Sequence, residues 1–130
     1  MRHEVFCLCD AATESQGKLN ILGAFDSVTA AQLPAIVPGC SVAIRIRVDG
    51  TEDGQHGFRI VVIETDGRTV VGPIEGTFGV RIGRGIQSAS VNLVVNFQGI
   101  QLPHHGDYRI DMVVDGQLLC SVPLFVRPPA

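Results

Sequence analysis

The fold is decided by residues 104–120, which read HHGDYRIDMVVDGQLLC. Apolar and polar residues alternate from Tyr108 to Val114, and a second extended segment starts at Gln117, after the pair Asp115-Gly116. An Asp-Gly pair between two such segments is a strong signal for a tight hairpin, because both residues tolerate the left-handed backbone that the turn requires. The stretch therefore predicts two antiparallel strands.

The rest of the chain shows the same two-residue period, and no segment carries a full helical stripe. Strands are predicted at about residues 4–9, 18–25, 42–48, 57–65, 68–82, 91–97, 108–114 and 117–126. Val28–Pro38 holds two prolines and is predicted as an extended crossover, and Asp66-Gly67 as a two-residue hairpin turn. We expect a bulge or an edge strand at Gly72-Pro73, and an edge in the second half of the last strand, after Pro123.

Seven or eight short strands predict an all-β fold, an antiparallel β-sandwich, and the absence of a linker predicts a single domain over residues 1–130. Tyr108 begins one of the strands and follows Gly106 by two residues. This arrangement resembles the immunoglobulin-like sandwiches, in which a tyrosine at this place bonds back to the upstream backbone. We therefore interpret Gly106 and Tyr108 as a structural corner, although Ile110 stands where antibody domains carry cysteine.

Composition narrows the class of protein. Hydrophobic residues make up 45% of the chain and charged residues 18%, which is typical of a globular domain. The net charge of -3 disfavours a nucleic-acid partner bound through a basic surface, and no apolar run is long enough for a membrane helix. No export signal is visible, so a cytoplasmic location is expected, with reduced core thiols at Cys7, Cys9, Cys40 and Cys120.

The histidines are the first candidates for chemistry. His104 and His105, with Asp107, could bind a metal or act in acid–base catalysis. Two adjacent residues rarely hold one ion, however. His3, Cys7 and Cys9 offer three potential zinc ligands on one strand face, but alternate side chains about 7 Å apart suit a shared ion poorly. No nucleophile motif or phosphate-binding glycine loop accompanies them. We therefore expect no metal and no cofactor.

Four arginines are the remaining candidates, and they open or line predicted strands. If those strands lie in one sheet, the side chains could form a cationic strip that grips a carboxylate or phosphate group. The alternative is a set of solvated strand faces, each paired with an acid such as Glu64 or Asp111. The candidate binding residues are Arg45, Arg47, Arg59 and Arg109.

Both ends of the chain carry short motifs, among them Gly17-Lys18-Leu19, Leu33-Pro34-Ala35, Gly106-x-Tyr108 and Val114-Asp115-Gly116. With Glu4-Val5-Phe6 and Pro123-Leu124-x-Val126, these motifs resemble a family of small bacterial proteins known only as a domain of unknown function. The resemblance covers nearly the whole chain and implies no activity, ligand or catalytic residue.

The leading functional hypothesis is a non-enzymatic binding or interaction module, whose partner is another protein or a second copy paired through a sheet edge or face to face. One alternative is a metal-dependent hydrolase that uses the His104, His105 and Asp107 loop. Another is a structural component of a larger bacterial or phage-like assembly, which fits the same size and fold.

Overall fold

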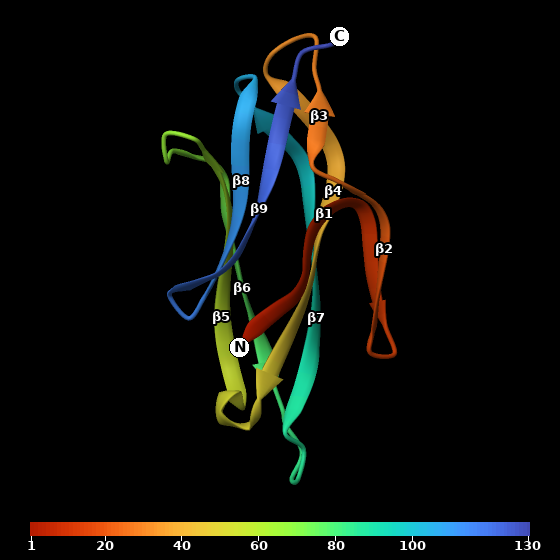
Figure 1. The fold of residues 1–130 in the computed structure, drawn as a ribbon, viewed down its shortest axis with the longest axis vertical. Helices are drawn as coiled ribbons and strands as arrows, with labels where there is room; N and C mark the ends of the chain where they lie inside the picture. The colour runs from red at the N-terminus through yellow and green to blue at the C-terminus, as the bar shows by residue number, and fades with distance from the viewer.

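The computed structural model describes residues 1–130, as nine strands and one 3-10 turn (Figure 1). The elements are β1 (Arg2–Ser15), β2 (Lys18–Phe25), β3 (Ser27–Thr29), β4 (Ala35–Asp49), η1 (Gly50–Glu52), β5 (Gly54–Glu64), β6 (Thr69–Val80), β7 (Ser88–Leu102), β8 (Gly106–Val114) and β9 (Gln117–Arg127). The structure contains no helix with the length and apolar character needed to cross a membrane.

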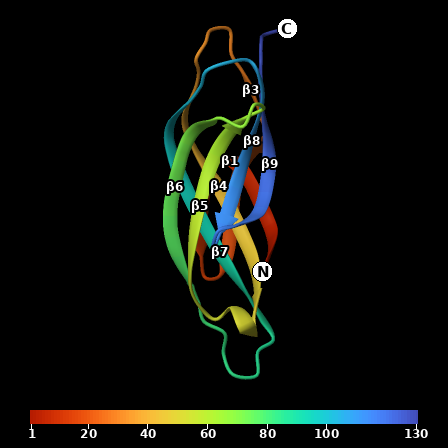
Figure 2. The ribbon, with the colours of Figure 1, turned by 90° about the vertical axis from the view of Figure 1, so that its left-hand side faces the viewer.

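The strands form two sheets that face one another (Figure 2). One sheet has the order β2-β1-β4-β7, and the other has the order β3-β9-β8-β5-β6. All neighbours are antiparallel except β3 and β9, which pair in parallel. The all-β sandwich is therefore confirmed, and its order places β1, β4 and β7 opposite β9, β8, β5 and β6, as in immunoglobulin-like sandwiches.

Strict alternation in β4 builds one wall of the core. Val42, Ile44 and Ile46 are 0% exposed and face the other sheet, where Ile60 and Ile110 are also 0% exposed. Aliphatic side chains fill the space between the sheets because successive residues of a strand point to opposite faces. Burial of this cluster supplies the main driving force for folding.

Tyr108 makes the backward bond of a tyrosine corner. Its hydroxyl accepts from the His104 N–H at 2.9 Å and donates to the His104 carbonyl at 2.7 Å, while its ring is 5% exposed. Gly106 has a φ of 134°, a conformation that side chains rarely adopt. The two residues thus fix the path by which the chain enters β8.

The two hairpin turns that the sequence predicts differ in length. Asp115 and Gly116 have φ values of 51° and 80°, so they form the expected two-residue turn between β8 and β9. The prediction of a two-residue turn at Asp66-Gly67 is wrong, because β5 ends at Glu64 and β6 begins at Thr69. There the Gly67 N–H bonds the Glu64 carbonyl, and left-handed Gly67, with a φ of 90°, completes a longer loop.

Further corrections concern the strand limits. The crossover predicted over Val28–Pro38 contains the end of β3 and the first residues of β4, which raises the strand count to nine. β3 pairs with Phe125–Arg127, so the second half of β9 is not an edge, contrary to the prediction from Pro123. The irregularity expected at Gly72-Pro73 is confirmed: the β5–β6 register shifts there, and β6 is an edge strand.

The four cysteines are free, and three of them are buried in the described fold. Loss of solvent on burial raises the pKa of Cys40 to about 11 and that of Cys120 to about 12. Cys9 is 0% exposed and donates its thiol hydrogen to the Ser41 carbonyl. Such thiols remain protonated near neutral pH and serve as small apolar residues.

The hydrogen bonds of the Tyr108 corner lead us to expect that removal of the Tyr108 hydroxyl destabilises the fold. Tyr108→Phe keeps the ring in place but leaves the His104 N–H and carbonyl without their partner. We expect the free energy of unfolding to fall by about 0.5–1.5 kcal/mol. Urea denaturation followed by circular dichroism measures this difference, and an unchanged midpoint would show that the corner contributes no stability.

Candidate functional site

His105 and Asp107 each contact a different part of the chain. The His105 ring bonds the Ala30 carbonyl at 2.8 Å, and the Asp107 carboxylate pairs with Arg127 at 3.3 Å. No group of three or more His, Cys, Asp or Glu side chains is arranged to hold a metal ion. The backbone of His104 is instead engaged by the Tyr108 corner.

Arg45 and Arg47 lie on the outer face of β4 and share one acidic partner. Glu4, at a bulge in β1, accepts from Arg45 Nε at 3.0 Å and from Arg47 Nε at 3.1 Å. The hydrogen bond from Arg47 is the main reason that the pKa of Glu4 lies below its ordinary value of 4.5. These two arginines are therefore paired strand-face residues.

The other two arginines belong to the second sheet. Arg59 lies on β5, opposite Glu75 of β6, and Arg109 on β8 donates from Nε to both carboxylate oxygens of Asp111 at 3.0 Å. A single strip through all four arginines would require their strands to lie in one sheet. In the structure β4 belongs to one sheet, and β5 and β8 belong to the other, so the four side chains do not form one strip. The chain crosses between sheets through η1, so the consecutive strands β4 and β5 do not pair.

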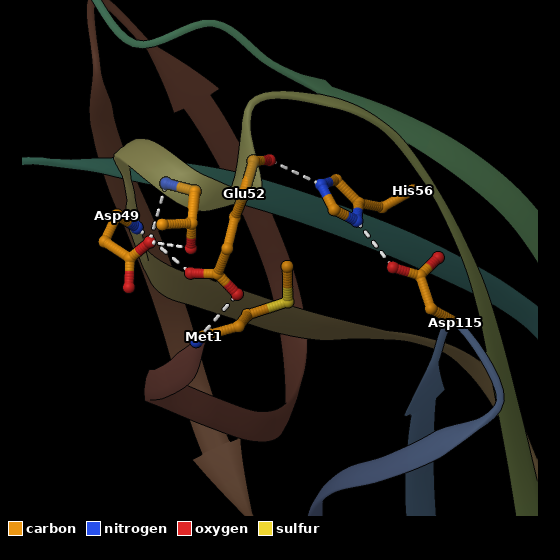
Figure 3. A network of polar contacts seen from close by, with 6 residues as sticks. Met1, Asp49, Glu52, His56 and Asp115 are labelled. Atoms are coloured by element: carbon orange, nitrogen blue, oxygen red, sulfur yellow. Dashed lines mark hydrogen bonds and ion pairs between the residues drawn. The ribbon is translucent and has the colours of Figure 1, made fainter.

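A polar network that the sequence did not reveal lies at the end of the sandwich near the N-terminus (Figure 3). The Met1 ammonium group pairs with Glu52 at 2.8 Å, and the Glu52 carboxylate also accepts from the Asp49 N–H. His56 reaches the Glu52 carbonyl through Nε2 and the Asp115 carboxylate through Nδ1, each at 2.6 Å. Its ring stacks on Phe78, with the centroids 5.5 Å apart.

The two polar contacts of His56 favour its protonated form. A carbonyl oxygen can only accept, so Nε2 donates to Glu52, and a carboxylate beside Nδ1 favours a second proton there. The Asp115 hydrogen bond is the largest cause that raises the pKa of His56, and the same contact is the largest cause that lowers the pKa of Asp115. With both ring nitrogens engaged, His56 has no free position for acid–base chemistry.

The feature best suited to recognition is the free edge of β7. This strand has 15 residues, and its neighbour in the sheet is β4 alone. No backbone hydrogen bond outside the sheet ladders involves a β7 residue, and no side chain bonds the β7 backbone. Alternate N–H and C=O groups along β7 therefore face solvent, as they do on any open sheet edge.

The side chains of β7 are also incompletely covered. Val91, Leu93 and Val95 point into the sandwich but are only partly buried. Their neighbours across the ladder on β4 are Ile46, Ile44 and Val42, each 0% exposed. The contrast follows from position, since β4 has a strand on both sides and β7 has one on a single side.

β7 also lacks the features that usually protect an edge. It holds no charged residue, no histidine and no proline, and its register with β4 continues without a shift from Ser88 to Gln98, after which comes left-handed Gly99 with a φ of 71°. By comparison, the edge strand β6 carries Pro73 and Glu75 at its irregular segment, β3 has three residues, and β2 has eight, including Lys18 and left-handed Gly23. A long, regular and uncharged edge is prone to pair with another strand.

Comparisons with known proteins place the chain in a family but assign it no activity. A model of a family of unknown function (DUF6941) matches residues 4–127. No curated protein matches. Among solved structures, the chain is similar to the alkylpurine DNA glycosylase AlkC of Pseudomonas fluorescens bound to DNA with an abasic site analog, at 9% identity and a TM-score of 0.44.

A second similar structure is an immunoglobulin-like protein of Pseudomonas aeruginosa, at 17% identity and a TM-score of 0.37. The match covers 97% of this chain and 95% of that protein. The glycosylase match covers 97% of this chain but only 30% of the glycosylase chain. Both TM-scores lie below 0.5, so neither likeness carries an argument about what this chain does.

The contacts of His56 predict a pH dependence of stability. A raised pKa means that the contribution of His56 is fully present below its ordinary value of 6.5 and is lost as pH rises through the folded-state pKa. The contribution of Asp115 runs the other way: it is present above 3.8 and is lost as pH falls through its lowered pKa. Between these limits the pair stabilises the fold most.

We expect the stability difference between the wild type and His56→Gln to shrink as pH rises above 6.5. Urea midpoints measured across this range test the expectation. His3→Gln is the matched control, because the His3 side chain is exposed and makes no hydrogen bond or ion pair. A wild-type advantage over His56→Gln that stays constant with pH would show that the contacts of His56 do not favour its protonated form.

Proposed function

Because the chain belongs to DUF6941, a family of unknown function, we propose its role from the fold alone: it is an interaction module that accepts a β-strand at the free edge of β7. The observation that carries the proposal is a free edge that runs regularly from Ser88 to Gln98 without charge or proline. Strand addition supplies main-chain hydrogen bonds for affinity, and alternate side chains give specificity.

Three partly buried side chains support this role. Val91, Leu93 and Val95 lie along the inner side of the edge, where an added strand would cover them. Removal of such apolar surface from water contributes about 25 cal/mol per Å², in addition to the backbone hydrogen bonds. The strand is held in register by β4, so binding requires little ordering of the module itself.

The charged side chains elsewhere on the surface are less suited to binding a partner. The arginines of β4 are paired with Glu4, Arg109 is paired with Asp111, and His56 is bonded at both nitrogens. The loop of His104 and His105 belongs to no group of three or more His, Cys, Asp or Glu side chains that could hold a metal ion. An interaction role is therefore favoured over the hydrolase alternative.

A strand-donor peptide tests the edge directly. The probe is a labelled peptide with the sequence of residues 88–98, extended by terminal lysines for solubility, and it is titrated into dilute full-length protein. We expect saturable binding, with slower amide hydrogen exchange in β7 and no change in β6, because only β7 offers a regular free edge.

The control is the same peptide with N-methyl groups on two consecutive residues, matching Val94 and Val95. Consecutive amides of a strand point to opposite edges, so this peptide cannot pair regularly along either edge. Equal binding of both peptides, or protection confined to strands other than β7, would show that the edge is not a strand acceptor.

A further inference from the structure

Residues 90–98 of β7 read SVNLVVNFQ, and the residue types repeat in the same order in both directions from Val94. The matching positions are an aliphatic pair, an identical amide pair and a large apolar pair: Leu93 with Val95, Asn92 with Asn96, and Val91 with Phe97. The segment ends in polar residues at both sides.

We propose that the partner of this edge is a second copy of the chain, with the two β7 strands antiparallel and centred on Val94. The inference rests on the proposed function, since it names the occupant of the same edge. A two-fold axis perpendicular to a sheet passes through the middle of one residue pair, so one residue faces its own copy. The neighbours on either side then pair at equal distances from that residue.

The inner face of the joined strands is apolar under this pairing. Leu93 faces the partner's Val95, and Val91 faces the partner's Phe97. Within one copy, Val91, Leu93 and Val95 are only partly buried, so the second copy covers apolar surface that the isolated sandwich leaves open. A perpendicular axis also keeps both sandwiches on the same side of the continuous sheet.

On the outer face of the joined strands, the asparagine side chains also find hydrogen-bond partners. Asn96 accepts from the Ser41 hydroxyl at 2.6 Å, and its Nδ2 makes no hydrogen bond within the chain. Asn92 donates from Nδ2 to the Gly17 carbonyl at 3.1 Å, and its Oδ1 accepts from Arg45 Nη1 at 3.2 Å, which leaves one lone pair on that oxygen. Asn96 can therefore donate to the partner's Asn92, and the two-fold axis forms this contact twice.

Charge favours a second copy over a different partner. An edge that recognises a charged segment needs complementary charge along its length, and Ser88–Leu102 has none. A self-paired edge must be neutral at its centre, because a charged residue on the axis would face an identical charge. The strand at the other edge of this sheet is β2, whose sequence differs from that of β7. The β7 strand therefore pairs with the partner's β7 strand, and assembly stops at a dimer.

Oligomeric state tests the proposal. Sedimentation velocity of the full chain from about 1 to 500 µM spans the range expected for a small interface. We expect a reversible monomer–dimer equilibrium for the wild type. Val94→Lys, which places two ammonium groups opposite one another, is expected to weaken it by about tenfold or more.

Two double variants that differ only at position 96 test the register. In N92E/N96K each acidic side chain faces a basic one of the other copy, so the dimer is retained. In N92E/N96E every such contact joins like charges, and we expect at least about tenfold weaker association. Urea midpoints of the separate monomers show whether either variant fails for lack of folding.

Cross-linking gives an independent measure of the axis. Val94→Cys is expected to form covalent dimers with a short bis-maleimide, since paired side chains lie about 5 Å apart. Gln98→Cys is the control, because that residue faces the partner's Ser90 and lies about 26 Å from its own copy. The wild type, with three buried thiols and one that is partly buried, sets the background.

The outcomes separate this proposal from the proposed function. A wild type that stays monomeric throughout, while the peptide of residues 88–98 binds β7, overturns self-pairing and leaves the strand-acceptor role intact. A dimer that Val94→Lys does not weaken assembles elsewhere and overturns the pairing. Association beyond the dimer, or cross-linking at residue 98 as strong as at residue 94, overturns the two-fold centre.

Discussion

A strand pairs fully only when it has a neighbour on each side, and an open sheet always leaves two strands that lack one. This constraint shapes much of the architecture. In the second sheet, the short parallel strand β3 covers the end of β9, and β6 is interrupted by a bulge at Gly72-Pro73. In the first sheet, β2 closes one side as a short hairpin strand, and β7 is left regular.

Polar contacts hold the sandwich at several places, and on β7 they involve the side chains of Asn92 and Asn96 but not the free backbone groups. Tyr108 fixes the entry to β8, and Asp115 joins the β8–β9 turn to β5 through His56 and the Gly57 N–H. Glu4 ties the N-terminal strand to β4. These contacts hold the sandwich from its ends and outer faces, so β7 is presented as a rigid strand. A rigid edge binds with little loss of conformational entropy.

Local signals in the sequence predicted local structure well. The Asp115-Gly116 turn, the alternation from Val42 to Val48 and the Tyr108 corner each depend on neighbouring residues, and each lies where it was expected. Contacts between distant segments were harder. His56 meets Asp115 across 59 residues of chain, and no spacing rule connects them. The four arginines were assigned to one sheet only conditionally, because strand order depends on packing of the whole chain.

The sequence shows that residues 88–102 carry no charge, but only the strand order shows that this segment lies at the edge of a sheet. In a central strand, inward-facing apolar residues such as Val91, Leu93 and Val95 are ordinary core; at an edge, the same residues are open to a pairing strand. Once β7 is known to be an edge, its symmetry also restricts the register. If the partner slips by two residues along the strand, the axis moves to Leu93 or Val95 and an asparagine faces Val94. The side-chain amide of that asparagine then has no amide opposite it in the other copy. If the contact with Val94 also buries the amide away from water, the cost is about 1–3 kcal/mol. The two asparagines therefore act as a register device: apolar side chains supply attraction in several alignments, and the amides favour the one centred on Val94.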